Sequence, residues 1–410
     1  MKKVREGYKM TELGEIPSEW AISKIGELTE IKTGGTPSTK CEKYWKDGDI
    51  PWMASGDVNK KIINKVDGRI TKSGMENSAA KLLPKDTVMI ALNGQGKTKG
   101  TVAYLNIELT CNQSLAGFLP SYNVFNSKYL YYNLQSRYFE IRGLAGDGAR
   151  NGLNLGLLRE ILIPIPSIKE QEKIASILST VDEQIDNVDA LIEKNKELKK
   201  GLMQTLLTKG IGHTKFKKTE IGEIPEEWDV KKLECVFEIL DSMRKPIKAS
   251  DREKIEGNIP YYGASGVIDW INDYIFDEEL ILLGEDGENL NSRNSDLAFK
   301  ISGKTWVNNH AHVFRVINKK ECNIDFMVYY LEAKDYSIYI AGSAQPKITQ
   351  AQCRKFLLPL PEKQEQDKIA SILLESDKKI EEYENKKQKL EELKKGLMQE
   401  LLTGMIRVTV

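Results

Sequence analysis

The stretch ELKKGLMQTLLT at residues 197–208 returns almost unchanged as ELKKGLMQELLT at residues 392–403, 195 positions later. The stretch IPIPSIKEQEKIASIL at 163–178 returns with the same offset as LPLPEKQEQDKIASIL at 358–373, and TELGEIPSEW at 11–20 returns as TEIGEIPEEW at 219–228. A period near 200 residues is far longer than the roughly 20–50 residues of solenoid repeats. The pattern predicts two duplicated halves, related by an approximate two-fold axis if they pack on each other.

Between the repeated segments the two halves diverge, so each half is a constant frame around a variable insert. Short similar motifs remain within the inserts, since DIPW at 49–52 and NIPYYG at 258–263 each follow a repeated Trp by about 30 residues. The predicted domains are a first head at 1–165, a conserved spacer helix at 166–210, a second head at 211–360 and a second spacer helix at 361–410. We call the two heads head one and head two.

The repeated segments 167–209 and 362–403 are each predicted to form one helix. Ser167 and Glu170 form a capping-box pattern at the first start. Apolar residues recur at spacings of four and three, which is typical of a coiled-coil seam, with polar interruptions at Asn195, Ser376 and Lys387. The apolar residues are Ile174, Leu178, Val181, Ile185, Val188, Ile192, Leu198 and Leu202, then Ile369, Leu373, Ile380, Tyr383, Leu390, Leu393, Leu397 and Leu401. About 40 residues span about 60 Å, which favours spacer helices over an ordinary helical core. We expect them to pack antiparallel, with the heads at opposite ends.

Both heads have the pattern of mixed α/β (α+β) domains. Strand-like segments occupy 86–92 and 100–105 in head one, and 279–284 and 312–317 in head two. Helical segments occupy 127–144 and 324–333. The predicted fold is therefore mixed α/β (α+β), with two globular domains separated by two long antiparallel coiled-coil helices with pseudo-two-fold symmetry.

The loops of both heads mix Asn, Gln, Arg, Lys and aromatic residues, which is the chemistry of DNA reading. Asn and Gln can bond adenine edges, Arg and Lys can bond guanine, and Lys can also hold phosphates. The candidate DNA-binding residues of head one are Lys32, Thr36, Lys40, Asn93, Gln95, Lys97, Lys99, Arg150 and Asn151. Those of head two are Arg244, Lys245, Tyr262, Arg293, Lys304, Asn308, Asn309, His310, Gln345 and Lys347. For any one of them, an ordinary solvated loop residue is the alternative.

Composition restricts the possible classes of protein. The 60 basic residues equal the 60 acidic ones, but head one has 23 basic against 17 acidic residues, and residues 213–360 have 20 against 24. A DNA reader with this balance is expected to rely on a basic partner for phosphate affinity. The chain shows no membrane-length apolar run and no secretory leader, and its five scattered cysteines form no zinc or disulfide pattern. We expect a reduced, cytoplasmic compartment.

Two motifs suggest chemistry without completing a site. ALNGQGKT at 91–98 approaches a phosphate-binding loop, but Ala91 stands where the pattern requires Gly, and a strand rather than a helix is predicted to follow. His310 and His312 would share a face of a strand, yet no third metal ligand is evident. No methyl-donor loop or nuclease-like cluster of acidic residues stands out. We therefore expect no catalytic residue and no metal on this chain.

With these repeats, the chain resembles the specificity subunit of type I restriction-modification systems. The residues that carry the resemblance are the GEIPxxW openings at 14–20 and 222–228, the two segments that end in KIASIL, the ELKKGLMQxLLT helix ends, and GKTWVNNHAH at 303–312. The likeness covers essentially the whole chain. It implies a non-catalytic subunit for anti-phage defence, in which each head reads one half of a split, asymmetric DNA site.

The resemblance also implies partners and cofactors. The conserved helices would dock two methyltransferase (modification) subunits, and restriction-translocase subunits would join them on double-stranded DNA. S-adenosylmethionine would sit on the methyltransferase subunit, and ATP and Mg on the restriction subunit, with no cofactor on this chain. The alternative is a coiled-coil scaffold whose two heads bind proteins rather than DNA.

Overall fold

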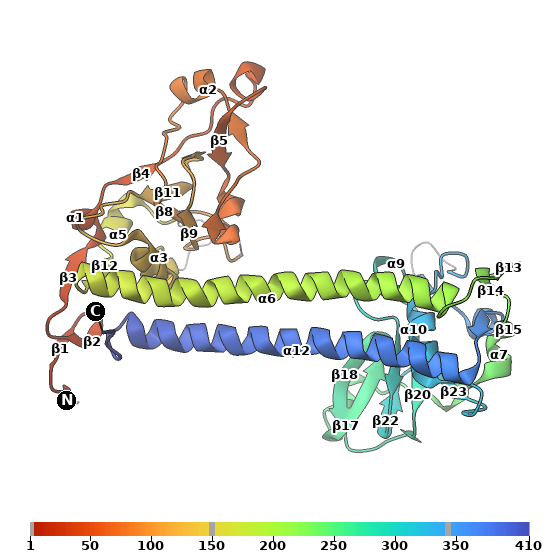
Figure 1. Cartoon of the computed structure of the whole chain (residues 1–410). Coiled ribbons are helices and arrows are strands. Elements are labelled where there is room, and N and C mark those ends of the chain that lie inside the picture. Colours follow the sequence, from red (N-terminus) through yellow and green to blue (C-terminus); the bar gives the residue numbers. More distant parts are fainter. Residues whose placement is uncertain (1–3, 95, 147–151, 341–345, 410) are drawn as a thin grey trace. The chain divides into compact units, whose positions relative to one another are not determined.

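The computed structural model describes residues 4–94, 96–146, 152–340 and 346–409. The chain divides into two compact units, one of residues 1–188 with 386–410 and one of residues 189–385. Each unit contains one head and part of both long helices (Figure 1). The predicted mixed α/β fold with two repeated domains and long helices is confirmed. Among the described residues, no helix is long and apolar enough to cross a lipid bilayer.

The two spacer helices are continuous, with α6 over Ile168–Lys209 and α12 over Lys363–Leu401. The predicted capping box at the start of α6 forms only in part. The Ser167 hydroxyl accepts a hydrogen bond from the Glu170 amide at 3.3 Å, but the Glu170 carboxylate accepts from the Trp20 indole at 3.1 Å instead of returning to the cap. A buried indole N–H needs an acceptor, so this distant contact replaces the local one.

Ion pairs show that the two helices run antiparallel within each unit. In the unit of head one, Asp182 of α6 pairs with Lys394 of α12 at 2.7 Å, and Glu170, nearer the start of α6, pairs with Arg407 beyond the end of α12 at 2.6 Å. Residues earlier in α6 thus lie beside residues later in the chain at α12, as two antiparallel helices require. The same order holds in the other unit, where the pairs are Lys196–Glu384 and Lys199–Asp377.

The predicted apolar seam is confirmed over most of its length, and buried members include Ile174, Leu178, Val188, Ile369 and Leu373. It is wrong at Leu198 and its repeat Leu393, which are 57% and 51% exposed. Leu198 lies six residues after Ile192, whereas a helix returns to one face after seven. The position seven residues on is Lys199, which faces the opposite helix and pairs with Asp377 there.

A five-stranded sheet of order β4-β11-β8-β9-β6 forms the centre of head one. Its strands are β4 (Ile31–Thr33), β6 (Ile62–Ile63), β8 (Val88–Ala91), β9 (Val102–Leu105) and β11 (Leu115–Phe118). β8 and β11 are buried along their whole length, so their side chains form core on both faces. A second sheet has the order β10-β5-β7, with β5 (Ile50–Met53), β7 (Arg69–Ile70) and β10 (Thr110–Cys111).

Head two contains a central sheet of order β16-β23-β20-β21, with β16 (Phe237–Ile239), β20 (Leu280–Gly284), β21 (Ala298–Ile301) and β23 (Ala311–Val316). Its second sheet has the order β18-β17-β22-β19, with β17 (Glu256–Gly263), β18 (Gly266–Ile271), β19 (Phe276–Asp277) and β22 (Lys304–Val307). Four strands of the two central sheets correspond in order, β4-β11-β8-β9 to β16-β23-β20-β21, and β6 of head one has no counterpart in the described part of head two. In both heads the IP motif lies on a second-sheet strand, β5 or β17, that pairs in parallel with β10 or β22.

Each head is attached to the helices by the same set of elements. Hairpins β1–β2 (Tyr8–Thr11, Gly14–Pro17) and β13–β14 (Phe216–Thr219, Gly222–Pro225) begin the two frames. Strand β3 (Ala21–Lys24) pairs with β12 (Leu162–Ile165), and β15 (Asp229–Lys232) pairs with β24 (Leu357–Leu360). Trp20 and Trp228 are each 1% exposed beside these strands. The repeated sequence is therefore the attachment site of each head.

Buried glutamines tie one ten-residue helix of each head to the spacer helix that follows the head. Gln171 accepts a hydrogen bond from the Asn126 amide at 2.8 Å and donates to the Pro166 carbonyl at 2.9 Å. Gln366 repeats both bonds at 2.8 Å, to the Asn323 amide and the Pro361 carbonyl. The helices held in this way are α3 (Ser127–Ser136) and α10 (Ile324–Ala333).

The segment predicted as one helix at 127–144 forms two, because α3 is followed by α4 (Tyr138–Gly143) after a break at Arg137. The Arg137 guanidinium donates to the Leu162 carbonyl at 2.5 Å and pairs with Glu140, so a tertiary contact decides the turn. The remaining short elements are α1 (Ile25–Leu28), η1 (Glu42–Tyr44), η2 (Ser55–Lys60), α2 (Lys72–Glu76), α5 (Leu155–Arg159), α7 (Leu233–Val236), η3 (Asp241–Met243), α8 (Ala249–Arg252), α9 (Asn289–Ser292) and α11 (Gln350–Cys353).

Candidate nucleic-acid interface

In head one, four strand ends meet at one edge of the central sheet. β4 and β8 end there, and β9 and β11 begin there, because neighbouring strands among these four are antiparallel. The connections at this edge, residues 34–36, 92–94, 96–101 and 112–114, are called edge one. Four predicted DNA-binding residues lie on it: Thr36, Asn93, Lys97 and Lys99. Sheet topology thus brings together residues that are up to 63 positions apart in the sequence.

The glycine-rich loop of edge one is supported from α4. The Tyr138 hydroxyl donates to the Lys97 carbonyl at 3.1 Å, and the Arg142 guanidinium donates to the Lys99 carbonyl at 3.1 Å. Arg142 also lies over the Tyr138 ring and bonds its hydroxyl at 3.0 Å. These bonds engage the backbone of the loop, so the Lys97 side chain remains exposed for an anionic ligand. The strand β9 that follows confirms the expectation that this is no helix-backed phosphate loop.

In head two, the corresponding edge of the central sheet collects the second set of predicted residues. We call residues 240–245, 285–288, 308–310 and 346–348 edge two. β16 and β20 end at this edge and β23 begins there. Tyr262 lies beside it, since its carbonyl accepts from the Asn308 amide at 3.0 Å. The predicted residues on edge two itself are Arg244, Lys245, Asn308, Asn309, His310 and Lys347.

A network of charged side chains lies under edge two. The Arg244 guanidinium, only 12% exposed, pairs with Glu285 at 2.5 Å and with Asp241 at 3.5 Å. Lys347 pairs with Glu285 from the surface at 2.9 Å, and this bond raises the pKa of Lys347. The buried His312 ring bonds Asp241 at 2.7 Å through Nδ1. Arg244 is therefore a support of the loops rather than a freely exposed side chain.

The protonation of His312 determines the charge of this network. Burial lowers the pKa of His312, but hydrogen bonds with Asp241 and Cys353 outweigh it and raise the pKa to about 10. Burial likewise raises the pKa of Asp241, yet its bond to His312 holds that pKa below the usual value. At neutral pH, two carboxylates are then matched by three cationic groups. Edge two contains four acidic residues, Asp241, Glu285, Asp286 and Glu288, and three basic ones, Arg244, Lys245 and Lys347, so the His312 imidazolium brings its charges into balance.

Asp241, Glu285 and His312 lie close enough to share a metal ion. Both ring nitrogens of His312 are already engaged, Nδ1 with Asp241 and Nε2 with the Ile348 carbonyl at 2.9 Å. Arg244 occupies the space between the two carboxylates with its own positive charge. The donor set therefore fits a charge network and does not fit a cation. His310, two residues earlier, is exposed and bonds Asp286 at 2.9 Å instead of sharing a face with His312.

Some predicted residues do not gather at either edge. Lys32 lies within β4 and pairs with Glu30 at 3.2 Å, and Lys40 is exposed farther along the loop after edge one. Lys304 begins β22 at the strand end opposite Asn308, over the Tyr274 ring. Arg293 joins α9 to the end of α10 by donating to the Glu332 carbonyl at 2.6 Å. Gln95, Arg150, Asn151 and Gln345 lie outside the described residues.

Sequence reasoning missed two polar residues of edge one, Asn112 and Gln113. The Gln113 side chain is exposed, and its Oε1 accepts a hydrogen bond from the Thr36 hydroxyl at 2.6 Å. A signal was present, because TCNQS at 110–114 and WVNNH at 306–310 both join a second-sheet strand to a central strand. The two stretches share only one identical residue, so the sheet topology shows their equivalence and a comparison of their sequences does not.

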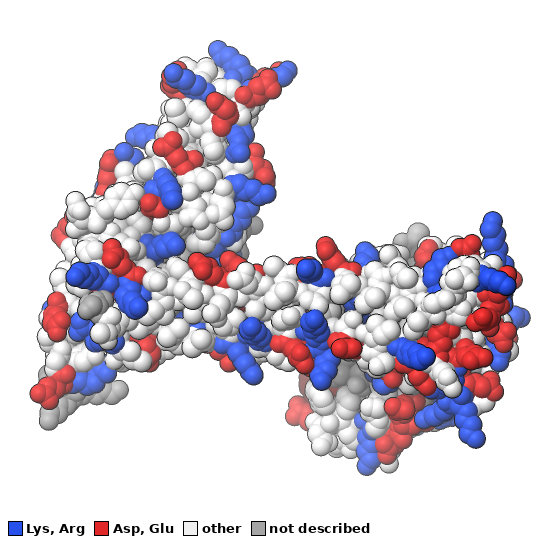
Figure 2. Space-filling view, in the orientation of Figure 1, with Lys and Arg blue, Asp and Glu red and all other residues white. Residues whose placement is uncertain are grey.

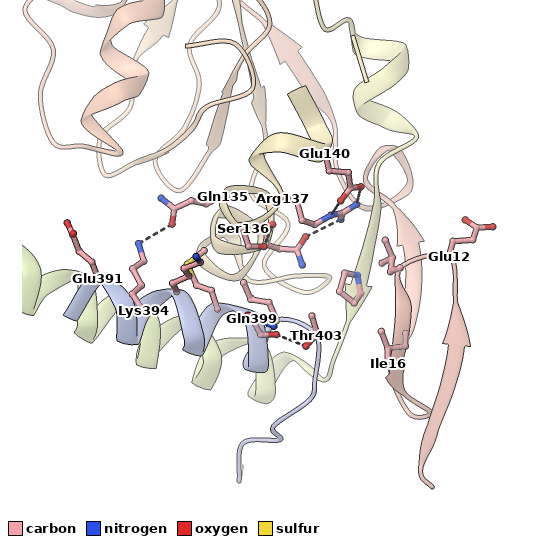
Figure 3. Close-up of a pocket in the computed structure, with 16 residues that line it drawn as sticks. Glu12, Ile16, Gln135, Ser136, Arg137, Glu140, Glu391, Lys394, Gln399 and Thr403 are labelled. Carbon is pink, nitrogen blue, oxygen red and sulfur yellow. Dashed lines mark hydrogen bonds and ion pairs between the residues drawn. The ribbon is translucent and has the colours of Figure 1, made fainter. Parts of the chain in front are cut away.

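A groove of about 730 Å³ in the unit of head one is lined by residues of the β1–β2 hairpin, α3, α4 and the C-terminal part of α12, and no residue of edge one is part of its lining. Figure 3 shows Gln135 bonded to Lys394 at 3.0 Å along one wall, and Arg137 paired with Glu140 along another. Leu13, Ile16, Met398 and Leu402 give it an apolar lining. In the face that Figure 2 shows, Lys and Arg alternate with Asp and Glu over both units.

Comparison with known proteins gives consistent matches along the chain. A family model described as type I restriction modification DNA specificity domain matches residues 17–199 and 225–392. The type I restriction enzyme MjaIX specificity subunit of Methanocaldococcus jannaschii is 26% identical over 98% of this chain and 96% of the relative. The EcoR124I/EcoR124II specificity subunit of Escherichia coli is 27% identical over 48% of this chain and 50% of the relative. The fold resembles a type I restriction-modification S subunit from M. genitalium, with a TM-score of 0.62 and 19% identity over 97% of both chains.

Proposed function

The chain belongs to the family of type I restriction modification DNA specificity domains, and on that premise we propose that its two heads read the two halves of a split, asymmetric DNA site through edge one and edge two. As a specificity subunit of such a system it is non-catalytic, and it supplies the DNA specificity of the complex. The observation that carries the proposal is a repeated frame that presents different polar side chains at the same edge of equivalent sheets.

The proposed contacts divide by chemistry. Asn93 in head one and Asn309 and His310 in head two supply hydrogen-bonding groups for base edges. The predicted Asn308 is only 5% exposed, and its Oδ1 accepts from the His310 amide, so it supports the loop instead. Lys97, Lys99, Lys245 and Lys347 supply positive charge for phosphates, which fixes position without reading sequence. Thr36 and Arg244 support the loops through hydrogen bonds, from Thr36 to the Gln113 side chain and from Arg244 to the Ala311 carbonyl. Lys32, Lys40, Gln95, Arg150, Asn151, Tyr262, Arg293, Lys304 and Gln345 remain proposals from the sequence.

Two methyltransferase subunits are proposed to dock on the repeated frame, one on each unit. Leu198 and its repeat Leu393 support this, because each is a large apolar side chain that stays more than half exposed on a spacer helix. Two equivalent exposed surfaces suit two copies of one partner. Restriction-translocase subunits would join this assembly. S-adenosylmethionine would bind the methyltransferase, and ATP and Mg the restriction subunit.

Charge balance supports the shared assembly. A neutral chain releases few counterions from DNA alone, so the partners are expected to supply much of the phosphate affinity. The five cysteines are all unpaired, which agrees with the cytoplasmic location proposed for such a complex. The family assignment favours this reading over a protein-binding scaffold, which finds no support in the comparisons.

The test is binding of the complex reconstituted with its methyltransferase subunits. A random duplex library would first be selected to obtain the bound sequence, and affinities for that duplex and a scrambled one would be compared across salt concentrations. We expect a bipartite consensus and at least roughly 1000-fold preference at physiological salt. Equal affinity for both duplexes at every salt concentration would overturn the proposal.

A further inference from the structure

One turn has the same geometry in both heads, at edge one and at edge two. In head one, β10 pairs in parallel with β5 and leads through residues 112–114 into β11. In head two, β22 pairs in parallel with β17 and leads through residues 308–310 into β23. The strand order agrees as well, because β11 lies between β4 and β8, and β23 lies between β16 and β20.

The first residue of each turn is an asparagine that closes the turn with its own side chain. Asn112 Oδ1 accepts from the Ser114 amide at 3.0 Å, and Asn308 Oδ1 accepts from the His310 amide at 2.8 Å. This Asx turn fixes the direction of the residue that follows it. Gln113 and Asn309 therefore occupy the same place in the two heads.

These two residues share a chemistry that the residues following them do not. Both are exposed and both end in a carboxamide, whereas the next position is Ser114 in one head and His310 in the other. A carboxamide offers one acceptor and two donors on a planar group. Adenine presents the complementary pair in the major groove, an N6 amino donor beside the N7 acceptor, and Asn or Gln can bond both at once.

We propose that Gln113 and Asn309 are specificity-determining residues, each of which bonds the N6 and N7 edge of one adenine in its own half of the DNA site. This inference rests on the proposed function, and it assigns Gln113 a role that the sequence patterns did not suggest. The adenine in question stays paired in the duplex, because its major-groove edge is accessible there.

The surroundings of Gln113 favour this bidentate bond. Thr36 donates its hydroxyl hydrogen to Gln113 Oε1 at 2.6 Å, which sets the orientation of the amide. The amide oxygen keeps a second lone pair for the adenine N6 hydrogen, and the amide nitrogen has two hydrogens of which one can reach N7. Thr36 is thus a positioning residue, and a base contact is made by Gln113.

In head two the loop is held from its backbone. The Arg244 guanidinium donates to the Ala311 carbonyl at 2.8 Å and approaches the Asn309 carbonyl at 3.4 Å. Because Glu285 and Asp241 fix Arg244 in turn, the loop has a rigid base below the exposed Asn309 side chain. A side chain held in position loses less conformational freedom on binding.

The experiment uses the full chain in complex with its methyltransferase subunits, and compares wild type with Gln113→Ala and Asn309→Ala. Sites are selected from a random duplex library for each protein. We expect each variant to lose preference at one A·T pair by roughly 5- to 150-fold, in different half-sites, with all other positions unchanged. A uniform loss of affinity on all sequences, or an unchanged consensus, would overturn the inference.

A single-atom change in the DNA tests the contact directly. Replacing the adenine at the affected position by 7-deazaadenine removes the N7 acceptor and leaves base pairing intact. Wild type is expected to bind this duplex more weakly, while Gln113→Ala binds both duplexes alike. Gln113→Glu, which can only accept, is expected to move the preference at that position towards cytosine and its N4 donor. Equal sensitivity of wild type and Gln113→Ala to the deaza base would contradict the contact.

Two controls separate this inference from the proposed function. Lys319→Ala changes an exposed residue beyond the other end of β23, where it pairs with Glu279 at 3.7 Å, and should leave the consensus as it is. Thermal unfolding should show that the Gln113 and Asn309 variants are as stable as wild type, since both side chains are exposed. If wild type itself selects no consensus, the proposed function fails. If wild type selects one and the variants retain it, only the adenine contacts fail.

Discussion

The ammonium of Lys394 lies 2.7 Å from the carboxylate of Asp182, and 195 residues earlier Lys199 forms the same ion pair with Asp377. In each case the carboxylate belongs to the spacer helix that follows a head, and the lysine to the other spacer helix. A tyrosine of the head completes both networks, with hydroxyl-to-carboxylate distances of 2.8 Å for Tyr132 and 2.5 Å for Tyr329. The repeated sequence thus fastens each head to both helices.

Replacing Lys394 or Lys199 should lower the stability of the unit that contains the lysine. Lys394→Met removes the ammonium that lies 5.3 Å from the centroid of the Tyr132 ring, and leaves Asp182, which is 23% exposed, without its ion pair. We expect the free energy of unfolding to fall by about 1–2 kcal/mol, because a partly buried acceptor loses a charged partner. Lys199→Met should behave alike. Urea denaturation measures both, and Lys46→Met, from an exposed pair with Glu42, should change stability by less than about 0.5 kcal/mol.

The buried histidine of head two should make stability depend on pH. The pKa of His312 is about 10 in the folded chain, above its ordinary value of 6.5. Its contribution is therefore fully present below pH 6.5 and is lost as pH rises through about 10. Relative to His312→Gln, wild type should lose unfolding free energy between pH 7 and 10, with a slope of at most about 1.4 kcal/mol per pH unit.

The comparison is made by chemical denaturation of both proteins at pH 6, 8 and 10. Subtracting the His312→Gln curve removes the titration of other groups that the two proteins share. The exposed His310→Gln variant serves as the matched control and should keep the slope of wild type. Parallel curves for wild type and His312→Gln would show that the imidazolium is absent from the folded state.

The two exposed leucines of the spacer helices should each control one partner subunit. Leu198→Glu and Leu393→Glu place a charge on an exposed apolar surface, so folding should be unaffected while docking is disfavoured. Native mass spectrometry of the reconstituted complex should show two methyltransferase subunits with wild type, one with either variant and none with the double variant. A full complement on the double variant would locate the docking surface elsewhere.

Replacing a glycine by alanine should have opposite effects on stability just after the end of α12 and in its interior. Gly404 has a φ of +72°, and a Cβ there would lie 2.5 Å from Pro17 and 3.0 Å from Trp20. Gly404→Ala should therefore lower the free energy of unfolding by about 1–2 kcal/mol or more, because backbone strain and the steric clash add together. Gly396 lies within α12 with no neighbour near its Cβ position. Gly396→Ala should stabilise by about 0.5–1 kcal/mol in thermal or urea unfolding.

The sequence alone determined the duplicated frame, the two long helices and the mixed α/β heads. α10 was predicted over its whole length, and β8, β9, β20 and β23 fall within one residue or two of the predicted segments. These features depend on spacing along the chain, because a helix or a strand repeats its buried face at a period that local sequence displays.

Only the tertiary structure decided which residues meet. The seam passes through Lys199 and Lys394 rather than Leu198 and Leu393, because an acidic residue of the opposite helix lies across from each lysine. Glu170 leaves its local cap for the indole of Trp20, 150 residues away. Gln113 and Asn309 become equivalent only once strands β10 and β22 lie in place. The residues that a side chain contacts depend on which elements pack against it, whereas the amino-acid sequence gives only its neighbours along the chain.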